Sequence, residues 1–342
     1  MAGLRRRADR RPQGLSRQVI RVLGVLSITV PIYLVMAVGW LATRGGLFDR
    51  AEMRVFGKYV INLALPALLF NALSQRSVAE VLNRVFIAAY AGGSLLAMAA
   101  GVFWARRVAG KPLSAAAIVG MGMSCPNSGF IGFPLVMQVL GGSTAGVGLA
   151  LAMVVENFLL LPLALAIADS DLGEAGATGT RGERLRAALR QSARGIVRNP
   201  MIHGIALGFL FSLFGWRLPE PVAKAVNLFA MSTAALSLMV IGGSLVGIRA
   251  RGMARDVGTI AAGKLLLHPL AVLLMVVLLP PMDSQLQTAV VVMAAVPMLG
   301  IYPILAQKHG HDSMAAAAQL GTTVLSFFTL TSLLWLLQQA GR

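Results

Sequence analysis

The chain has 342 residues, of which 57% are hydrophobic and 13% charged, and its mean hydropathy is +0.75. Soluble domains average about 25% charged residues, so the composition excludes a soluble enzyme core and predicts an all-α integral membrane protein. The net charge of +17 does not indicate a nucleic-acid partner, because the arginines fall in short loops and an N-terminal tail without interleaved aromatic residues.

Ten apolar segments are predicted to span the membrane as helices, since several exceed the ~18 residues that hydrocarbon requires. The polar stretch 169–199 divides them into five and five and carries a basic amphipathic helix at 183–198. We therefore divide the chain into a basic tail (1–21), a first group of spans (22–168), this cytoplasmic loop and a second group (200–338). In chain order the spans are 22–43, 51–74, 85–105, 113–140, 144–168, 200–215, 222–246, 256–279, 285–307 and 314–338.

Arginine and lysine counts predict the orientation. If the first span starts outside, the cytoplasmic loops hold sixteen such residues and the opposite side holds five, so both termini are expected outside. The N-terminal tail opposes this assignment, because its seven arginines would also lie outside. The count of basic residues is then sixteen on the cytoplasmic side against twelve outside. The sequence leaves the side of the tail open.

A weak internal repeat relates the two halves. Residues 134–142 and 303–311 share a proline, a glutamine four positions on and a glycine seven positions on, and 31–39 and 200–208 share a proline and a glycine. Spans 1–5 are thus predicted to repeat as spans 6–10. An odd number of spans per repeat inverts the second copy in the membrane.

Helix breakers interrupt the fourth and ninth spans. The fourth is predicted to form two half-helices, 113–124 and 129–140, and the ninth to break around 297–303. Unpaired backbone groups at this depth are tolerated where they line a cavity or are buried in protein, and helix amino termini attract anions. A pair of proline kinks without function is the alternative. The candidate substrate-binding residues at the breaks are Pro126, Asn127, Ser128, Gly129, Pro297, Gly300 and Tyr302.

Ionisable residues within spans are functional candidates, because a charge at a helix centre costs about 2.5–3.5 kcal/mol. Glu156, followed by Asn157, lies midway along the fifth span, and Lys264 in the eighth could neutralise it. A purely structural ion pair is the alternative. Asn62 and Asn227 could line the site from spans 2 and 7, or simply hydrogen-bond between helices.

Other polar residues are weaker candidates. His203 and His268 each sit beside a proline and are predicted to be packing residues and not relays. The loop 309–312, with two histidines and an acid, is a weak metal candidate. No nucleotide-binding, metalloprotease or Ser/His/Asp arrangement occurs in a suitable context, so we expect no cofactor, no metal and no enzymatic activity.

Several segments resemble the auxin efflux carrier family, whose members include plant auxin carriers and bacterial carriers for malonate and malate. They are PNSGFIGFPL (126–135), the opening 28–49, NLALPALLF (62–70) and KLLLHPL (264–270). The resemblance runs from about Val25 to the end. It implies a fold related to bile-acid symporters and sodium/proton antiporters, with broken spans 4 and 9 crossing at mid-membrane. It also implies a scaffold of spans 1, 2, 6 and 7, a mobile core of spans 3–5 and 8–10, and a coupling-ion role for Glu156.

We therefore expect a multi-pass transporter of the cell (inner or plasma) membrane that carries a small organic anion, such as malonate, malate or an auxin-like acid. Transport would follow elevator-type alternating access and would be coupled to H⁺ or Na⁺. A sodium/proton exchanger of the same architecture is the alternative, although Glu156 lacks the second adjacent acid usual in such antiporters. A membrane protein that is not a carrier is the third option. A homodimer is compatible with the sequence, which leaves substrate, direction, coupling ion and oligomeric state open.

Overall fold

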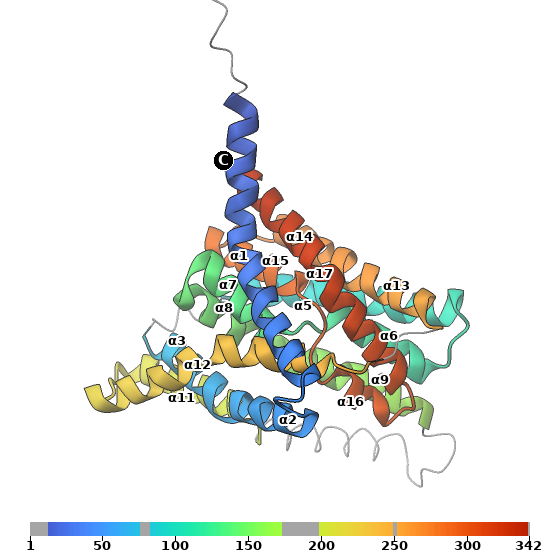
Figure 1. Ribbon diagram of the computed structural model, residues 1–342, viewed down its shortest axis with the longest axis horizontal. Coiled ribbons are helices and arrows are strands. Elements are labelled where there is room, and N and C mark those ends of the chain that lie inside the picture. The colour runs from blue at the N-terminus through green and yellow to red at the C-terminus, as the bar shows by residue number, and fades with distance from the viewer. Residues whose placement is uncertain (1–12, 76–82, 173–197, 249–251, 341–342) are drawn as a thin grey trace, which may run out of the picture.

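The computed structural model describes residues 13–75, 83–172, 198–248 and 252–340 (Figure 1). Within these ranges the chain is helical, and extended segments pair at one isolated antiparallel bridge, between Pro126 and Met298. The first twelve residues of the predicted tail lie outside the described residues. So does the amphipathic helix predicted at 183–198, except for its last residue.

The helices follow the predicted segments closely. In chain order they are α1 (Gln13–Arg44), α2 (Arg50–Tyr59), η1 (Val60–Ala64), α3 (Leu65–Ser74), α5 (Arg84–Phe103), η2 (Trp104–Val108), α6 (Leu113–Ser124), η3 (Ser128–Gly132), α7 (Phe133–Leu140), α8 (Gly142–Val155), η4 (Glu156–Leu160), α9 (Leu161–Leu172), α11 (Pro200–Phe214), α12 (Glu220–Ser244), α13 (Ala254–Ala262), η5 (Gly263–Leu267), α14 (His268–Leu278), α15 (Ser284–Ala295), α16 (Tyr302–Gln307) and α17 (Asp312–Ala340). The elements labelled η are π-helical turns, which continue the adjoining α-helices.

Seven helices among the described residues are long and apolar enough to cross a membrane. They are Leu23–Arg44, Arg50–Ser74, Arg84–Val108, Gly142–Asp169, Glu220–Ser244, Ala254–Leu278 and Asp312–Gln339. Shorter apolar helices cover the fourth, sixth and ninth predicted spans: Leu113–Ser124, Ser128–Leu140, Pro200–Phe214 and Ser284–Ala295. The predicted interruptions of the fourth and ninth spans are present.

Prolines set the positions of four of the five π turns. η1, η3, η4 and η5 each begin six residues before a proline, namely Pro66, Pro134, Pro162 and Pro269. A proline ring clashes with the carbonyl four residues earlier and donates no hydrogen bond. The wider π turn accommodates both effects without ending the helix. Three of these turns carry the polar residues Ser128, Glu156 and Lys264.

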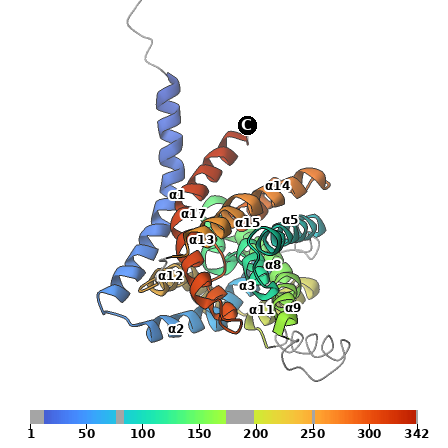
Figure 2. The same ribbon diagram turned by 90° about the vertical axis from the view of Figure 1, so that its right-hand side faces the viewer.

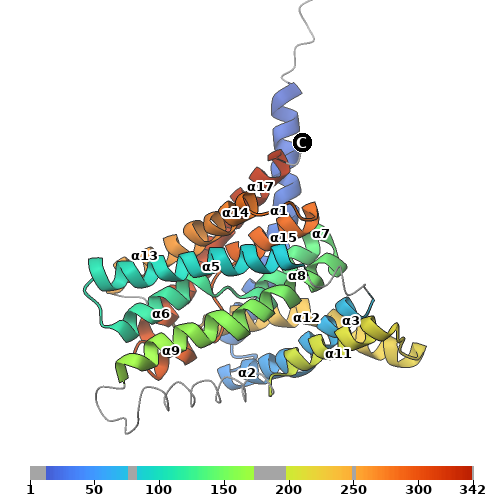
Figure 3. The same cartoon turned by 180° about the vertical axis from the view of Figure 1, so that it is seen from behind.

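The helices pack in two groups. α5, α6, α9 and α13 run together in one group, and α2, α3, α11 and α12 form the other (Figure 3). α1 packs on α12 and on α17, and its amino-terminal end extends beyond the other helices (Figure 2). The contact between α1 and α12 is close, because a Cβ at Gly242 would overlap the Met36 carbonyl and one at Gly39 the Met239 carbonyl. Glycine is therefore required at this crossing.

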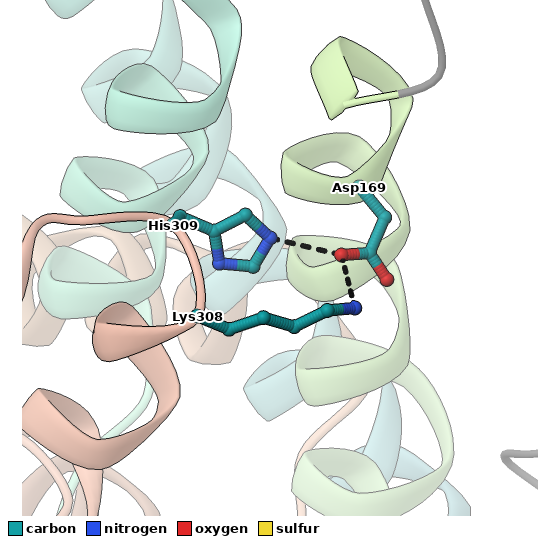
Figure 4. A network of polar contacts seen from close by, with 3 residues as sticks. All are labelled: Asp169, Lys308 and His309. Carbon is teal, nitrogen blue, oxygen red and sulfur yellow. Dashed lines mark hydrogen bonds and ion pairs between the residues drawn. The ribbon is translucent and has the colours of Figure 1, made fainter. Parts of the chain in front are cut away.

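Polar contacts join loops that are distant in the sequence. Asp169, near the end of α9, accepts from Lys308 Nζ at 2.8 Å and lies 2.9 Å from His309 Nε2 (Figure 4). Lys111 Nζ lies 3.0 Å from Asp256. Among the described residues no group of three or more His, Cys, Asp or Glu side chains is arranged to hold a metal ion. In the loop 309–312, His309 pairs with the Asp169 carboxylate of α9.

Candidate functional site

Two interrupted helices cross inside the core. The gap between α6 and η3 and the gap between α15 and α16 run as extended segments that pair with each other. The Asn127 N–H donates to the Pro297 carbonyl at 2.8 Å, and the Leu299 N–H donates to the Cys125 carbonyl at 3.1 Å. Pairing these backbone groups avoids the cost of leaving them unsatisfied away from water. The crossing is therefore a buried, hydrogen-bonded junction.

The side chain of Asn127 lies at the start of the helix that follows the first break. Its Oδ1 accepts from the Phe130 N–H at 3.2 Å. The residue is only 4% exposed. Its amide nitrogen is buried and has no hydrogen-bond partner among the described residues. A Cβ at Gly300 would lie 3.6 Å from that nitrogen, so the amide faces the second break. A buried donor without a partner costs about 1–3 kcal/mol, which an acceptor from a ligand would recover.

A buried carboxyl group bonds the residue that follows Asn127. Glu156, the first residue of η4, accepts from the Tyr90 hydroxyl at 2.6 Å and from the Ser128 hydroxyl at 2.5 Å. Both hydroxyls bond the same carboxylate oxygen, Oε1. Ser128 opens η3 directly after Asn127, so the carboxylate is tied to the start of the helix after the first break.

A buried lysine lies at the other break. Lys264 is fully buried, and its Nζ donates to the Ala294 carbonyl at 2.6 Å and lies 2.9 Å from His268 Nδ1. His268 Nε2 lies 2.8 Å from the Ser94 hydroxyl. An ammonium only donates, so Nδ1 of a neutral His268 accepts and its Nε2–H donates to Ser94. The network connects α5, η5, α14 and α15.

The position of this ammonium has an electrostatic consequence. Ala294 belongs to the last turn of α15, where unpaired carbonyls form the negative end of the helix dipole. Lys264 Nζ lies against that end and donates to it. No ion pair joins it to Glu156 among the described residues; its hydrogen bonds go to α14 and α15. Glu156 and Lys264 thus bond beside different breaks.

Two predicted site residues point elsewhere. Tyr302 is fully buried, and its hydroxyl donates to the Ile118 carbonyl of α6 at 2.9 Å. The Asn157 amide donates to the Met153 carbonyl at 2.8 Å, and its Oδ1 accepts from Asn199 at 3.2 Å, at the start of α11.

The helix after the second break, α16, has only six residues. The second break therefore lacks a long helix whose amino terminus could attract an anion.

The other predicted asparagines bond within the second group of helices. Asn62 is exposed and donates to the Lys58 carbonyl at 2.7 Å. Asn227 is exposed and accepts from Asn71 at 3.2 Å, which joins α3 to α12. No hydrogen bond links either residue to Asn127 among the described residues. The Asn62 bond is local and the Asn227 bond is interhelical.

Helix α12 covers the crossing from the second group. The Ser237 hydroxyl donates to the Phe130 carbonyl of η3 at 3.0 Å. A Cβ at Gly300 would lie 3.3 Å from Ile241 Cδ1, so both breaks contact the same face of α12. The crossing therefore sits where the two groups of helices meet.

Comparison with known proteins gives the family. A family model described as "Membrane transport protein" matches residues 25–336. The chain belongs to this membrane transport family. It is 27% identical over 322 residues to a "Putative malonate transporter" of Rhizobium meliloti, covering 93% of this chain and 97% of the relative. It is 25% identical to "Uncharacterized transporter YfdV" of Escherichia coli K12 (90% and 95% covered) and 21% identical to "Auxin efflux carrier component 8" of Arabidopsis thaliana (64% and 71% covered).

Membership of the membrane transport family confirms the resemblance to the auxin efflux carriers. The protein is a multi-pass transporter of the cell membrane and not an enzyme. A transporter implies a small-molecule substrate.

Sequence reasoning missed part of this network. Tyr90 and Ser94 lie four residues apart on one face of α5, and both are fully buried. His268 was predicted to pack, yet it bonds both Lys264 and Ser94. The only available signal was the i, i+4 spacing of Lys264 and His268, which places both on one helix face.

Proposed function

We propose that this transporter is a secondary carrier for a small organic anion, which binds at the first helix break. The observation that carries the proposal is the buried, unpartnered amide of Asn127 at the start of the thirteen-residue helix Ser128–Leu140. A helix amino terminus contributes up to about 2 kcal/mol toward an anion in a favourable, partly buried site. Pro126, Ser128, Gly129, Pro297 and Gly300 would surround the ligand, and Tyr302 would hold the second break in place. Malonate is the first compound to test, because one relative carries that name.

Proton coupling follows from the position of Glu156. An anion at Asn127 would be repelled by an ionised carboxylate bonded to the neighbouring Ser128 but not by a neutral one. The anion and a proton would therefore enter together. Lys264 already provides a cation at the carbonyl end of α15, where ion-coupled carriers with broken helices bind Na⁺. We accordingly favour H⁺ over Na⁺ as the coupling ion.

The membrane topology is part of the proposal. We infer ten spans in two inverted repeats, with helices 4 and 9 broken. In support, three polar contacts join loops assigned to the cytoplasmic side: Arg50 with the Val246 carbonyl, Lys111 with Asp256, and Lys308 with Asp169. Thr144 bonds Gln285 at 2.8 Å between two loops assigned to the opposite side.

The transport movement would follow from the two groups of helices. The group containing α5–α9 and α13–α17 carries the crossing, and we propose that it moves as the elevator against α1, α2, α3, α11 and α12. Ser237 and Ile241 of α12 would then exchange their contacts with the breaks during transport. A single hydrogen bond, from Ser237 to Phe130, crosses this contact and could be exchanged as the groups slide.

Reconstituted protein tests the function. Purified protein in proteoliposomes should take up malonate or another small carboxylate and acidify the lumen, as read by radiolabel and an internal pH dye. The same compound should raise the apparent melting temperature by mass action. Asn127→Ala should weaken both responses at least tenfold, whereas the matched control Asn71→Ala should keep them. Wild-type uptake by Asn127→Ala would remove the assignment. Proton flux driven by Na⁺ with no organic acid would instead support a sodium/proton exchanger.

A further inference from the structure

A cavity lies away from the crossing, at the end of α5. It has a volume of about 440 Å³ and is lined by Val102, Phe103, Arg106, Arg107, Gly110 and Lys111. The π turn η2 ends α5 here, and the chain turns back at Gly110, whose φ is +63°. Arg106 Nη1 donates to the Lys111 carbonyl at 3.1 Å, which closes the loop around the cavity.

The charge in this cavity is strongly positive. Lys111 is paired with Asp256 at 3.0 Å. Neither Arg106 nor Arg107 forms an ion pair within the described residues, and both are exposed. Two guanidinium groups therefore remain available, and guanidinium forks bind phosphate oxygens through paired N–H groups.

An apolar surface leads away from these cations along α5. Phe103 is 63% exposed and Leu96 is 50% exposed. They lie seven residues apart, so they share one face of the helix, two turns from each other. Val108 on the π turn is 57% exposed. A ligand with a charged head and an apolar tail would match this arrangement, whereas a soluble anion would use only the cations.

We propose that this cavity binds the phosphate headgroup of an anionic phospholipid. Arg106 and Arg107 would hold the phosphate, and an acyl chain would lie along Phe103 and Leu96. This loop is also assigned to the cytoplasmic side, where anionic lipids attract basic clusters beside membrane helices. The site is separate from the crossing, so the proposal does not depend on which substrate the protein carries.

Lipid binding to the full-length protein in detergent tests the site. Phosphatidylglycerol should remain bound in native mass spectrometry and raise the apparent melting temperature, whereas phosphatidylcholine should do neither. Arg106→Gln combined with Arg107→Gln should weaken phosphatidylglycerol binding at least tenfold. The matched control, Arg54→Gln combined with Arg84→Gln, removes the same charge from exposed positions and should bind as wild type.

Three outcomes would overturn the proposal. One is equal phosphatidylglycerol binding by the cavity variant and the control. Another is equal binding of phosphatidylcholine and phosphatidylglycerol. The third is equal stabilisation by inorganic phosphate, which would identify a free-anion site. If the double variant does not fold, the single variant Arg107→Gln decides the matter, because Arg107 has no hydrogen bond or ion pair in the described ranges to lose.

Discussion

The two helix breaks meet in space, yet their side-chain chemistry is opposite. The first is followed by thirteen helical residues and carries a free amide and a carboxylate, from Asn127 and Glu156. The second is followed by six helical residues, and a lysine bonds the carbonyl end of the helix before it. Tyr302 there donates away from the crossing.

The difference separates the roles of backbone and side chains. Proline and glycine interrupt the helix at both breaks. The side chains around each break decide whether a negative or a positive charge is stabilised there. The first break has one buried donor without a partner among the described residues. The second has its negative helix end already covered by Lys264. Four substitutions, given from the largest expected effect to the smallest, probe this asymmetry.

Lys264→Met should cost the most stability. It would leave the Ala294 carbonyl and His268 Nδ1 buried without a donor, at about 1–3 kcal/mol each. The apparent melting temperature of the detergent-purified protein should therefore fall well below that of Lys58→Met, a control at an exposed lysine. Sodium ions should partly restore the Lys264→Met variant and leave the wild type unchanged. A sodium response of the wild type equal to that of the variant would refute the idea that this lysine occupies a cation position.

Asn127→Ala should have the largest effect on ligand affinity. A hydrogen bond to a charged group contributes about 1.5–3 kcal/mol, which corresponds to about 10- to 100-fold weaker binding. Thermal-shift titration with the transported acid measures this loss. Tyr302→Phe, at the second break, should leave the affinity within about twofold, since its hydroxyl bonds Ile118. Equal losses in the two variants would mean that both breaks contact the ligand.

Glu156→Gln should uncouple anion and proton movement. The glutamine carbonyl can still accept from Tyr90 and Ser128, so we expect binding to persist and the fold to remain intact. Uptake of the acid should no longer be accompanied by luminal acidification in proteoliposomes. Asn157→Ala, which alters the neighbouring residue, should keep the acidification. Proton flux at the wild-type ratio in Glu156→Gln would assign coupling to another group.

Tyr302→Phe should have the smallest effect, on stability alone. The substitution removes one neutral hydrogen bond to the Ile118 carbonyl, which contributes about 1 kcal/mol. A small fall in melting temperature with unchanged transport is therefore expected. Loss of transport in this variant, with the melting temperature preserved, would place the Tyr302 hydroxyl at the substrate.

Local signals predicted the helices and their interruptions. The half-helix predicted at 113–124 coincides with α6, and the following half begins one residue before its predicted start. Both results follow from apolar composition and from proline. Proline disrupts hydrogen bonds only within the adjacent helical turn, so its effect is local and can be predicted from the sequence. The π turns were not predicted, although each of four lies at a constant spacing before a proline.

The sequence by itself determined a polytopic helical carrier with two breaks and marked Asn127, Glu156 and Lys264 as candidate functional residues. Only the tertiary structure decided that Glu156 bonds Tyr90 and Ser128, that Lys264 bonds His268 and Ala294, and that Tyr302 turns toward α6. These contacts join residues 28 to 184 positions apart, apart from the local pair Lys264 and His268. Their formation depends on how helices rotate against one another, which local patterns do not specify.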